Sequence, residues 1–143
     1  MSQIYRRSNV NQVIEGTVLT ASRKREKNSG LKRVWHATLN SRRSLLWLVR
    51  NEAAFRQELL MFTVLGSASF VLDVSALERC ALLVSLLLIL LVETLNTAIE
   101  ATIDRIALER HPLSGLAKDL GSAAVFISLL IAALVWGTIL FFR

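Results

Sequence analysis

Hydrophobic residues in this sequence gather in three stretches that contain no Asp, Glu, Lys, Arg or His. They are Leu59–Leu72 with 14 residues, Cys80–Val92 with 13 and Leu120–Phe142 with 23. A helix needs about 20 apolar residues to cross roughly 30 Å of hydrocarbon, so the third stretch is long enough to span a membrane unaided. The first two are shorter, and their length is also typical of buried helices in a soluble bundle.

Polar sequence that is compatible with a helix extends both short stretches. Residues 51–58 precede the first and residues 93–104 follow the second, and neither segment contains Gly or Pro. Helices whose ends turn acidic near the membrane boundary, beside one complete span, favour a membrane protein over a soluble bundle. We therefore predict an all-α membrane protein with three transmembrane helices, at about 52–72, 79–104 and 119–142.

The N-terminal segment has a different pattern. Residues 30–50 place Leu, Val and Trp among basic residues, which is typical of an amphipathic helix lying in the membrane interface. Residues 1–29 are polar, include the basic run 23–27 and lack the apolar core of a signal peptide, so we expect a flexible basic tail. Residues 30–143 are expected to form a single membrane domain.

Charge is divided unevenly along the 143 residues, which have a net charge of +6 and are 53% hydrophobic. The first 50 residues carry 11 Lys and Arg against two Glu, whereas the remaining residues carry six basic and nine acidic side chains. Such a basic segment favours an anionic lipid surface over nucleic acid, because Trp35 and Trp47 suit an interfacial helix better than a base-stacking surface. Basic residues near the N-terminus and in the 105–118 loop predict that both lie in the cytoplasm.

Four polar residues after the second apolar stretch share one helix face: Glu93, Asn96, Glu100 and Asp104. At 100° per residue they fall within about 80° of one another, over roughly three turns. A carboxylate in hydrocarbon costs about 2.5–3.5 kcal/mol on insertion scales, so this face should turn toward the protein interior or toward water. A helix end that simply emerges into water is the alternative, most plainly for Asp104.

A second acidic cluster, at 51–58, precedes the first apolar stretch, although Glu52 and Arg56 could also form an ordinary surface ion pair. Carboxylates from two helices would suit Mg²⁺, which binds one or two carboxylates together with substrate phosphates. Lys118 and Arg33 could then bind phosphate oxygens, and a carboxylate not engaged by metal could act as a general base. The chain has no GxxxxGK[ST] motif and only one Cys, which excludes a P-loop and a disulfide or Cys-based metal framework.

Three long motifs in this order and spacing resemble the prokaryotic diacylglycerol kinases, a family of small integral-membrane enzymes. They are NEAAFRQE at 51–58, VETLNTAIEATIDR at 92–105 and SGLAKDLGSAAV at 114–125. The resemblance covers about residues 30–143. It implies a homotrimer in the bacterial inner membrane, with active sites between the cytoplasmic ends of neighbouring helices. The reaction it implies is transfer of the ATP γ-phosphate to 1,2-diacylglycerol, giving phosphatidate for phospholipid metabolism.

The resemblance also implies a role for each matching residue. Glu93 corresponds to the general base, Glu52 and Glu100 to the residues that hold Mg²⁺, and Asn96 and Asp104 to positions that shape the site. Nucleotide contacts are implied for Arg33, Asn40, Glu52, Glu100, Glu109, Arg110, His111, Lys118 and Asp119. Contacts with diacylglycerol are implied for Arg33, Ala54, Phe55, Arg56, Gln57, Glu58, Glu93 and Ser122. Two positions differ from the family pattern. Asn40 stands where the family often has an aromatic residue, and Leu116 stands where a basic residue is common.

Three other functions remain open from the sequence. A polyprenol kinase of the same fold would share the motifs, although Gly121–Val125 resembles the diacylglycerol branch more. A non-catalytic membrane subunit or small transporter could use the acidic face for cation passage, and would need neither ATP nor Lys118. Binding of nucleic acid through the basic N-terminus is the least favoured, and we expect no nucleic-acid partner.

Overall fold

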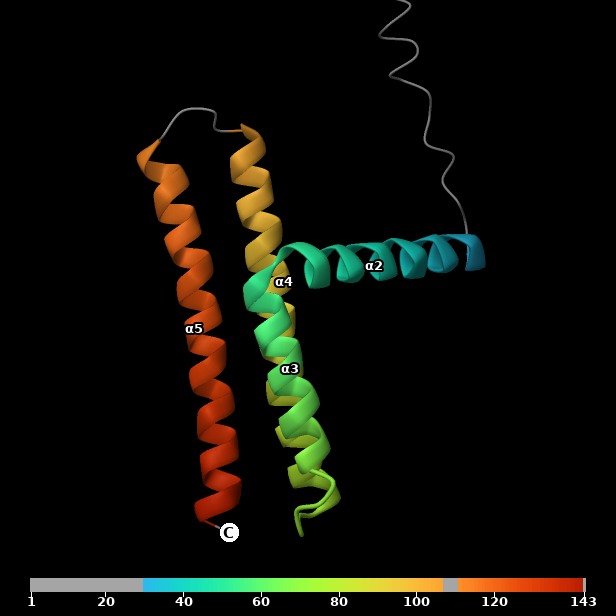
Figure 1. Ribbon diagram of the computed structural model, residues 1–143, viewed down its shortest axis with the longest axis vertical. Coiled ribbons are helices and arrows are strands. Elements are labelled where there is room, and N and C mark those ends of the chain that lie inside the picture. The colour runs from blue at the N-terminus through green and yellow to red at the C-terminus, as the bar shows by residue number, and fades with distance from the viewer. Residues whose placement is uncertain (1–29, 107–110, 143) are drawn as a thin grey trace, which may run out of the picture. The chain divides into compact units, whose positions relative to one another are not determined.

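The computed structural model describes residues 30–106 and 111–142, and these residues form α-helices with no β-strand. The prediction of an all-α protein is therefore confirmed for the described part of the chain. The tail expected at 1–29 lies outside it. The helices in order are α2 (Leu31–Asn51), α3 (Ala53–Ala68), α4 (Ala76–Ile106) and α5 (Pro112–Phe141) (Figure 1).

The chain divides after Arg42 into two units. The described part of the first unit is the beginning of α2, which follows Gly30. Gly30 has a φ of +66°, a conformation that glycine adopts without the steric cost of a Cβ. The second unit holds the end of α2 and the other three helices.

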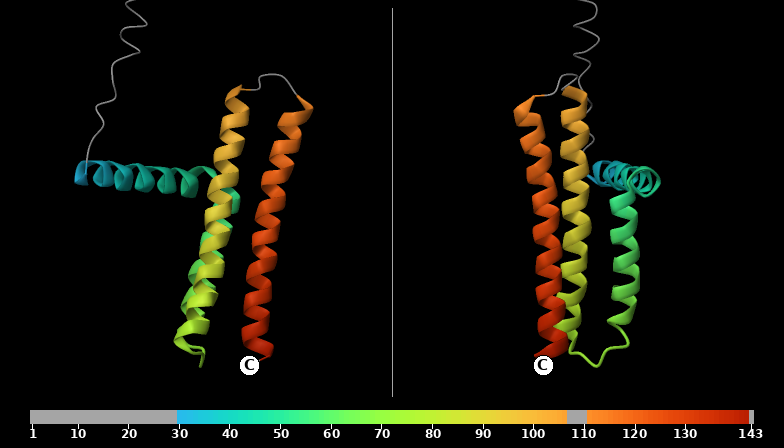
Figure 2. Two further views of the ribbon diagram at one scale, coloured as in Figure 1. Left: turned by 180° about the vertical axis from the view of Figure 1, so that it is seen from behind. Right: turned by 60° about the vertical axis from the view of Figure 1, so that its left-hand side comes forward.

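Within the second unit, α4 packs against both α3 and α5, and the three helices run alongside one another (Figure 2). The reason is the distribution of apolar residues, since α4 is apolar on more than one face. Its buried residues Leu86 and Ile89 meet Ala132 of α5. Partly buried side chains from α3 and α5 surround this cluster: Met61, Phe62, Leu65 and Trp136.

Two of the described helices are long and apolar enough to cross a membrane, α4 with 31 residues and α5 with 30. At 1.5 Å per residue each is roughly 45 Å long, which exceeds the ~30 Å hydrocarbon core. The surplus length in α4 allows its acidic end to leave the hydrocarbon. Helix α3 has 16 residues, about 24 Å, so the expected span over 52–72 is not matched by one continuous helix.

Helix α3 ends at Ala68, and the residues that follow it form turns whose carbonyl oxygens accept hydrogen bonds from Arg79. The guanidinium of Arg79 donates to the carbonyl oxygens of Ser69 (3.0 Å) and Leu72 (3.3 Å), and it lies 5.5 Å from the centre of the Phe70 ring. A carbonyl engaged in this way satisfies the backbone at the end of a helix. The connection to α4 is therefore fixed by one side chain from α4 itself.

Both long helices begin at local N-terminal signals. Before α4, the backbone N–H of Ser75 donates to Glu78 (2.7 Å) and the N–H of Glu78 donates to the Ser75 hydroxyl (3.3 Å), which is a capping box. Before α5, the His111 Nδ1 accepts from the N–H of Leu113 at 3.2 Å, and Pro112 occupies the first helical position. Helix α5 consequently starts ahead of the span expected at 119–142.

Candidate functional site

Carboxylates from α3 and α4 gather around Glu93. The side chains of Glu93 and Glu58 are 5% and 9% exposed, and Glu58 comes from the neighbouring helix α3. Glu93 lies within range of charge repulsion from Glu52, Glu58 and Glu100. Within residues 30–106 and 111–142, none of these four carboxylates forms an ion pair. The described structure therefore brings together acidic groups that no described Lys or Arg pairs with, an arrangement typical of functional sites.

The sequence folds this way because the polar face of α4 turns toward its neighbours. Glu93, Asn96 and Thr97 are all buried, whereas Leu95 on the opposite face is exposed. The Thr97 hydroxyl donates to the Glu93 carbonyl oxygen at 3.1 Å, so a polar side chain on this face is satisfied within the helix. The part of the expected acidic face that holds Glu93 and Asn96 is thus directed into the protein. Asp104 at the far end of this face is exposed, as the alternative of a helix end entering water expects.

Glu52 is positioned by the junction between α2 and α3. It is the N-cap residue of α3, with an extended backbone, and its side chain makes no capping hydrogen bond. Its N–H donates to the Leu48 carbonyl oxygen at 2.8 Å, which continues the hydrogen bonding of α2. The residue is half-buried, so it is partly accessible to solvent.

Asn96 connects the acidic face to α5. Its Nδ2 donates to the Glu100 Oε1 at 3.2 Å, and its Oδ1 is buried with no hydrogen-bond partner in the described residues. A side-chain carbon at Gly121 of α5 would overlap with this oxygen. The amide therefore fills the space between the two helices.

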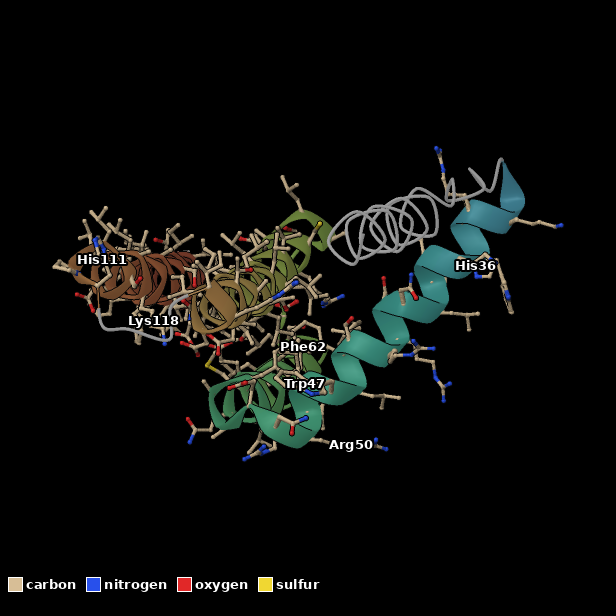
Figure 3. All side chains as sticks on the ribbon, turned by 90° about the horizontal axis from the view of Figure 1, so that it is seen from above. His36, Trp47, Arg50, Phe62, His111 and Lys118 are labelled. Atoms are coloured by element: carbon tan, nitrogen blue, oxygen red, sulfur yellow. The ribbon has the colours of Figure 1, made fainter. Side chains whose placement is uncertain are left out.

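An ion pair lies farther along the same helices. Lys118 of α5 donates from Nζ to the Asp104 Oδ1 of α4 at 2.6 Å, and Lys118 lies on the side of α5 that faces α4 (Figure 3). The family resemblance implies a nucleotide contact for Lys118 and a site-shaping role for Asp104, and no sequence pattern pairs the two. Asp119 and Ser122 of α5 are exposed in this chain.

The stretch expected to contact the lipid is divided between two environments. Phe55 and Glu58 are buried against the bundle, whereas Ala54, Arg56 and Gln57 are exposed, as the 3.6-residue period of α3 requires. Arg56 extends back along the chain, and its guanidinium donates to the carbonyl oxygens of residues 49 and 50 at 3.4 Å. Arg56 thereby covers the C-terminal end of α2.

The other residues expected to contact the nucleotide fall in three parts of the chain. Arg33 and Asn40 are exposed side chains of the first unit. His111 caps α5, and Glu109 and Arg110 lie outside the described residues.

The oxygen atoms at the site fit Mg²⁺ in type. Carboxylates and an amide oxygen are the hard ligands that this ion prefers, and it commonly uses only one or two carboxylates because phosphates supply the rest. In the described part of the chain, no three His, Cys, Asp or Glu side chains converge as a metal-binding group. Any magnesium held here would therefore depend on another ligand, as it does in a metal–nucleotide complex.

Beside the acidic face lies a groove of about 420 Å³ that the sequence did not reveal. Its walls are the end of α2, including Trp47 and Leu48, and small residues of α4. These α4 residues are spaced so that they form a stripe next to the acidic face, which is the signal that could have indicated the groove. The lining residues are Arg43, Ser44, Trp47, Leu48, Thr94, Thr97, Ala98 and Ala101.

Comparison with known proteins gives a consistent result. Residues 40–140 match the family described as prokaryotic diacylglycerol kinase. The chain is 53% identical over 112 residues to a diacylglycerol kinase of Pseudomonas aeruginosa, covering 78% of this chain and 91% of that protein. It is 44% identical over 116 residues to one of Haemophilus influenzae, covering 81% and 98%. A diacylglycerol kinase of Helicobacter pylori is 34% identical over 111 residues, covering 78% and 87%.

Proposed function

The chain belongs to the prokaryotic diacylglycerol kinase family and is a membrane enzyme that acts on diacylglycerol, and from that premise we propose that ATP is its phosphate donor. The γ-phosphate of ATP is transferred to the free hydroxyl of 1,2-diacylglycerol. The new bond joins the hydroxyl oxygen to phosphorus, the bond to the β-phosphate oxygen breaks, and the products are phosphatidate and ADP. The observation that carries this proposal is the group of unpaired carboxylates around buried Glu93.

Glu93 is the proposed general base. Its side chain is 5% exposed and lies at the point where the uncharged run 80–92 gives way to polar residues, so a lipid hydroxyl can approach it from the apolar side. A base within hydrogen-bond reach accepts the hydroxyl proton as the oxygen attacks phosphorus. Such a base contributes typically 10²–10⁴-fold to the rate.

Glu52 and Glu100 are the proposed Mg²⁺ ligands. Both lie near Glu93, and Glu52 is not engaged in capping its helix. Magnesium held by these two carboxylates would neutralise the negative charge of the phosphates in a loose transition state. The protein's own contribution is to hold these carboxylates on the polar side of Glu93, so that the phosphate chain and the lipid hydroxyl meet at that residue.

Nucleotide binding is proposed for the same end of α4 and α5. Lys118 carries three N–H donors, so it can bind a phosphate oxygen while it keeps Asp104 as a partner. Asp119 follows it on α5. The further nucleotide contacts proposed from the family motif are Arg33, Asn40, Glu109, Arg110 and His111.

The groove beside the acidic face is proposed to hold an acyl chain of the substrate. Its lining is mostly apolar, and Thr97 in its wall is one helical turn from Glu93. An acyl chain in the groove would bring the glycerol hydroxyl toward the base, with Phe55 and Glu58 on the α3 side. The contacts proposed for Arg33, Ala54, Arg56, Gln57 and Ser122 would surround the headgroup.

The proposed setting is the bacterial inner membrane, where the product supplies phospholipid recycling. The ends of the helices that carry the site face the cytoplasm in this proposal, because the segment before residue 51 is rich in Lys and Arg. Helix α3 with the turn that follows it would form a third membrane crossing. Many large apolar side chains of α5, such as Leu120, Phe126 and Leu134, are exposed in the single chain, which supports a homotrimer surrounded by lipid.

Transfer of labelled phosphate tests the proposal directly. The purified full-length protein in detergent is supplied with Mg²⁺ and γ-labelled ATP, with diacylglycerol or undecaprenol in parallel. We expect label in phosphatidate, and less or none in undecaprenyl phosphate. Label only in undecaprenyl phosphate would mean that the substrate is the polyprenol and not diacylglycerol. No label in either lipid would contradict the proposed kinase activity.

A further inference from the structure

One glycine of α5 lies directly against a side chain of α4, so that a residue with a Cβ at this position would have to displace it. A Cβ built on Gly121 would overlap with the Asn96 Oδ1 and would lie 3.2 Å from the Asn96 Cγ. The glycines at 115 and 137 of the same helix have open space at this position, and Gly66 of α3 meets only an ordinary contact at 3.5 Å. The close contact at Gly121 therefore involves the Asn96 side chain, which would have to move if a Cβ were added, whereas the α4 backbone is no closer than an ordinary contact.

The Asn96 amide has unequal surroundings at its two ends. Nδ2 donates to the Glu100 Oε1 at 3.2 Å, whereas Oδ1 is buried and has no hydrogen-bond partner in the described residues. A buried amide oxygen without a donor is not held in place by hydrogen bonding. This oxygen end of the amide lies against Gly121, while Nδ2 at the other end is directed toward Glu100.

We propose that Gly121 is a positioning residue, which seats the Asn96 amide so that its N–H holds the Glu100 carboxylate in the conformation that binds the magnesium–nucleotide complex. The inference rests on the proposed role of Glu100. Gly121 is not among the residues proposed above to contact ATP or lipid. It acts through Asn96, and the hydrogen bond occupies one carboxylate oxygen of Glu100 and leaves the other for the ion.

The substitution Gly121→Ala is the direct test. Partners that orient a metal ligand typically change metal affinity by about 10–100-fold when they are altered. We therefore expect the Mg²⁺ concentration that gives half-maximal rate to rise at least about tenfold, with the rate at saturating Mg²⁺ less affected. Gly115→Ala and Gly137→Ala are matched controls, because each adds the same methyl group to the same helix in open space.

Two further measurements, which do not require turnover, are made on the same three glycine variants. Binding of Mn²⁺ in the presence of a non-hydrolysable ATP analogue, followed by electron paramagnetic resonance, should weaken in Gly121→Ala alone among the three glycine variants. The thermal midpoint without nucleotide should fall in Gly121→Ala. It should stay the same or rise in the controls, because Ala favours a helix more than Gly does.

A double variant keeps the inference testable even if Gly121→Ala folds poorly. Removal of the Asn96 side chain creates the space that the new methyl group needs, so Asn96→Ala with Gly121→Ala should match Asn96→Ala alone in Mg²⁺ dependence and in thermal midpoint. Effects that multiply independently would overturn the inference, as would a Gly121→Ala protein that behaves like the two controls.

The reference variant Glu100→Gln separates this inference from the proposed function. If Glu100→Gln leaves the Mg²⁺ dependence unchanged, the proposed metal role of Glu100 is wrong. If Glu100→Gln shifts it and Gly121→Ala does not, only the positioning role of Gly121 fails.

Discussion

Lys118 of α5 and Asp104 of α4 form an ion pair whose Nζ and Oδ1 atoms are 2.6 Å apart. The side chains are 39% and 65% exposed, so water and ions reach both of them. Exposed pairs of this kind contribute little to stability because solvent screens them. What the pair does is hold an ammonium group at the end of the helices where the nucleotide is proposed to bind.

The first prediction separates the two members of this pair. Lys118→Gln should raise the KM for ATP by roughly tenfold or more, because a hydrogen bond from a charged donor to phosphate is lost. Asp104→Asn should leave the KM for ATP unchanged or lower it, because Lys118 is then released from a competing anion. Initial rates against ATP concentration at saturating lipid provide the measurement. Equal increases in both variants would mean that the intact pair, and not Lys118 by itself, orients the nucleotide.

The second prediction concerns Glu93. Glu93→Gln should lower kcat by about 10²–10⁴-fold, since the amide cannot accept the hydroxyl proton. Binding of the magnesium–ATP complex, measured by equilibrium dialysis, should stay within a few-fold of the unaltered protein. Weakened nucleotide binding together with a normal rate at saturation would mean that Glu93 binds the nucleotide and is not the general base.

The third prediction concerns the buried carboxylate of Glu58. Its Oε2 has no hydrogen-bond partner in the described residues, and its charge repels that of Glu93. Glu58→Gln should therefore raise the free energy of unfolding, on the order of 1 kcal/mol, when no nucleotide is present. The thermal midpoint in detergent measures this. Gln57→Ala is the control, because that side chain is an exposed neighbour. A lower midpoint in Glu58→Gln would show that the carboxylate has a stabilising partner.

The elements of the fold follow from local signals in the sequence, and most were predictable for that reason. The apolar runs indicate α4 and α5, and the 100° spacing places Glu93 and Glu100 on one face. Helices α4 and α5 begin before the spans expected at 79–104 and 119–142, at the helix-start signals formed by Ser75 with Glu78 and by His111 with Pro112. These signals are short, and the apolar run alone does not extend to them.

The site was predictable only as a set of residues on each helix. The resemblance supplied roles for Glu93, Glu52 and Glu100, and the structure brings these three near one another. The contact of Asn96 with Gly121 depends on the register between α4 and α5, which no pattern within either helix specifies. The groove beside Trp47 depends in the same way on where the end of α2 meets α4.

The fourth prediction distinguishes a helix cap from a metal ligand. Because the Glu52 side chain makes no capping hydrogen bond, Glu52→Ala should change the thermal midpoint little. The Mg²⁺ concentration for half-maximal rate should rise at least about tenfold, which corresponds to about 1.4 kcal/mol. His111→Ala provides the contrast, because that side chain does cap its helix and its loss should cost about 1 kcal/mol of stability. A large loss of stability in Glu52→Ala would make it a structural residue.

The last prediction tests the groove between α2 and α4. Ala98 is an exposed part of its lining, so Ala98→Leu adds apolar volume to the groove without disturbing the buried core. If an acyl chain occupies the groove, the KM for long-chain diacylglycerol should rise several-fold, while the KM for a short-chain diacylglycerol and that for ATP stay unchanged. Ala123→Leu is the matched control, because Ala123 is an exposed alanine of α5 outside the groove lining. An equal increase in KM for both chain lengths would indicate that the substitution affects the glycerol headgroup. No increase in KM would mean that no acyl chain binds in this groove.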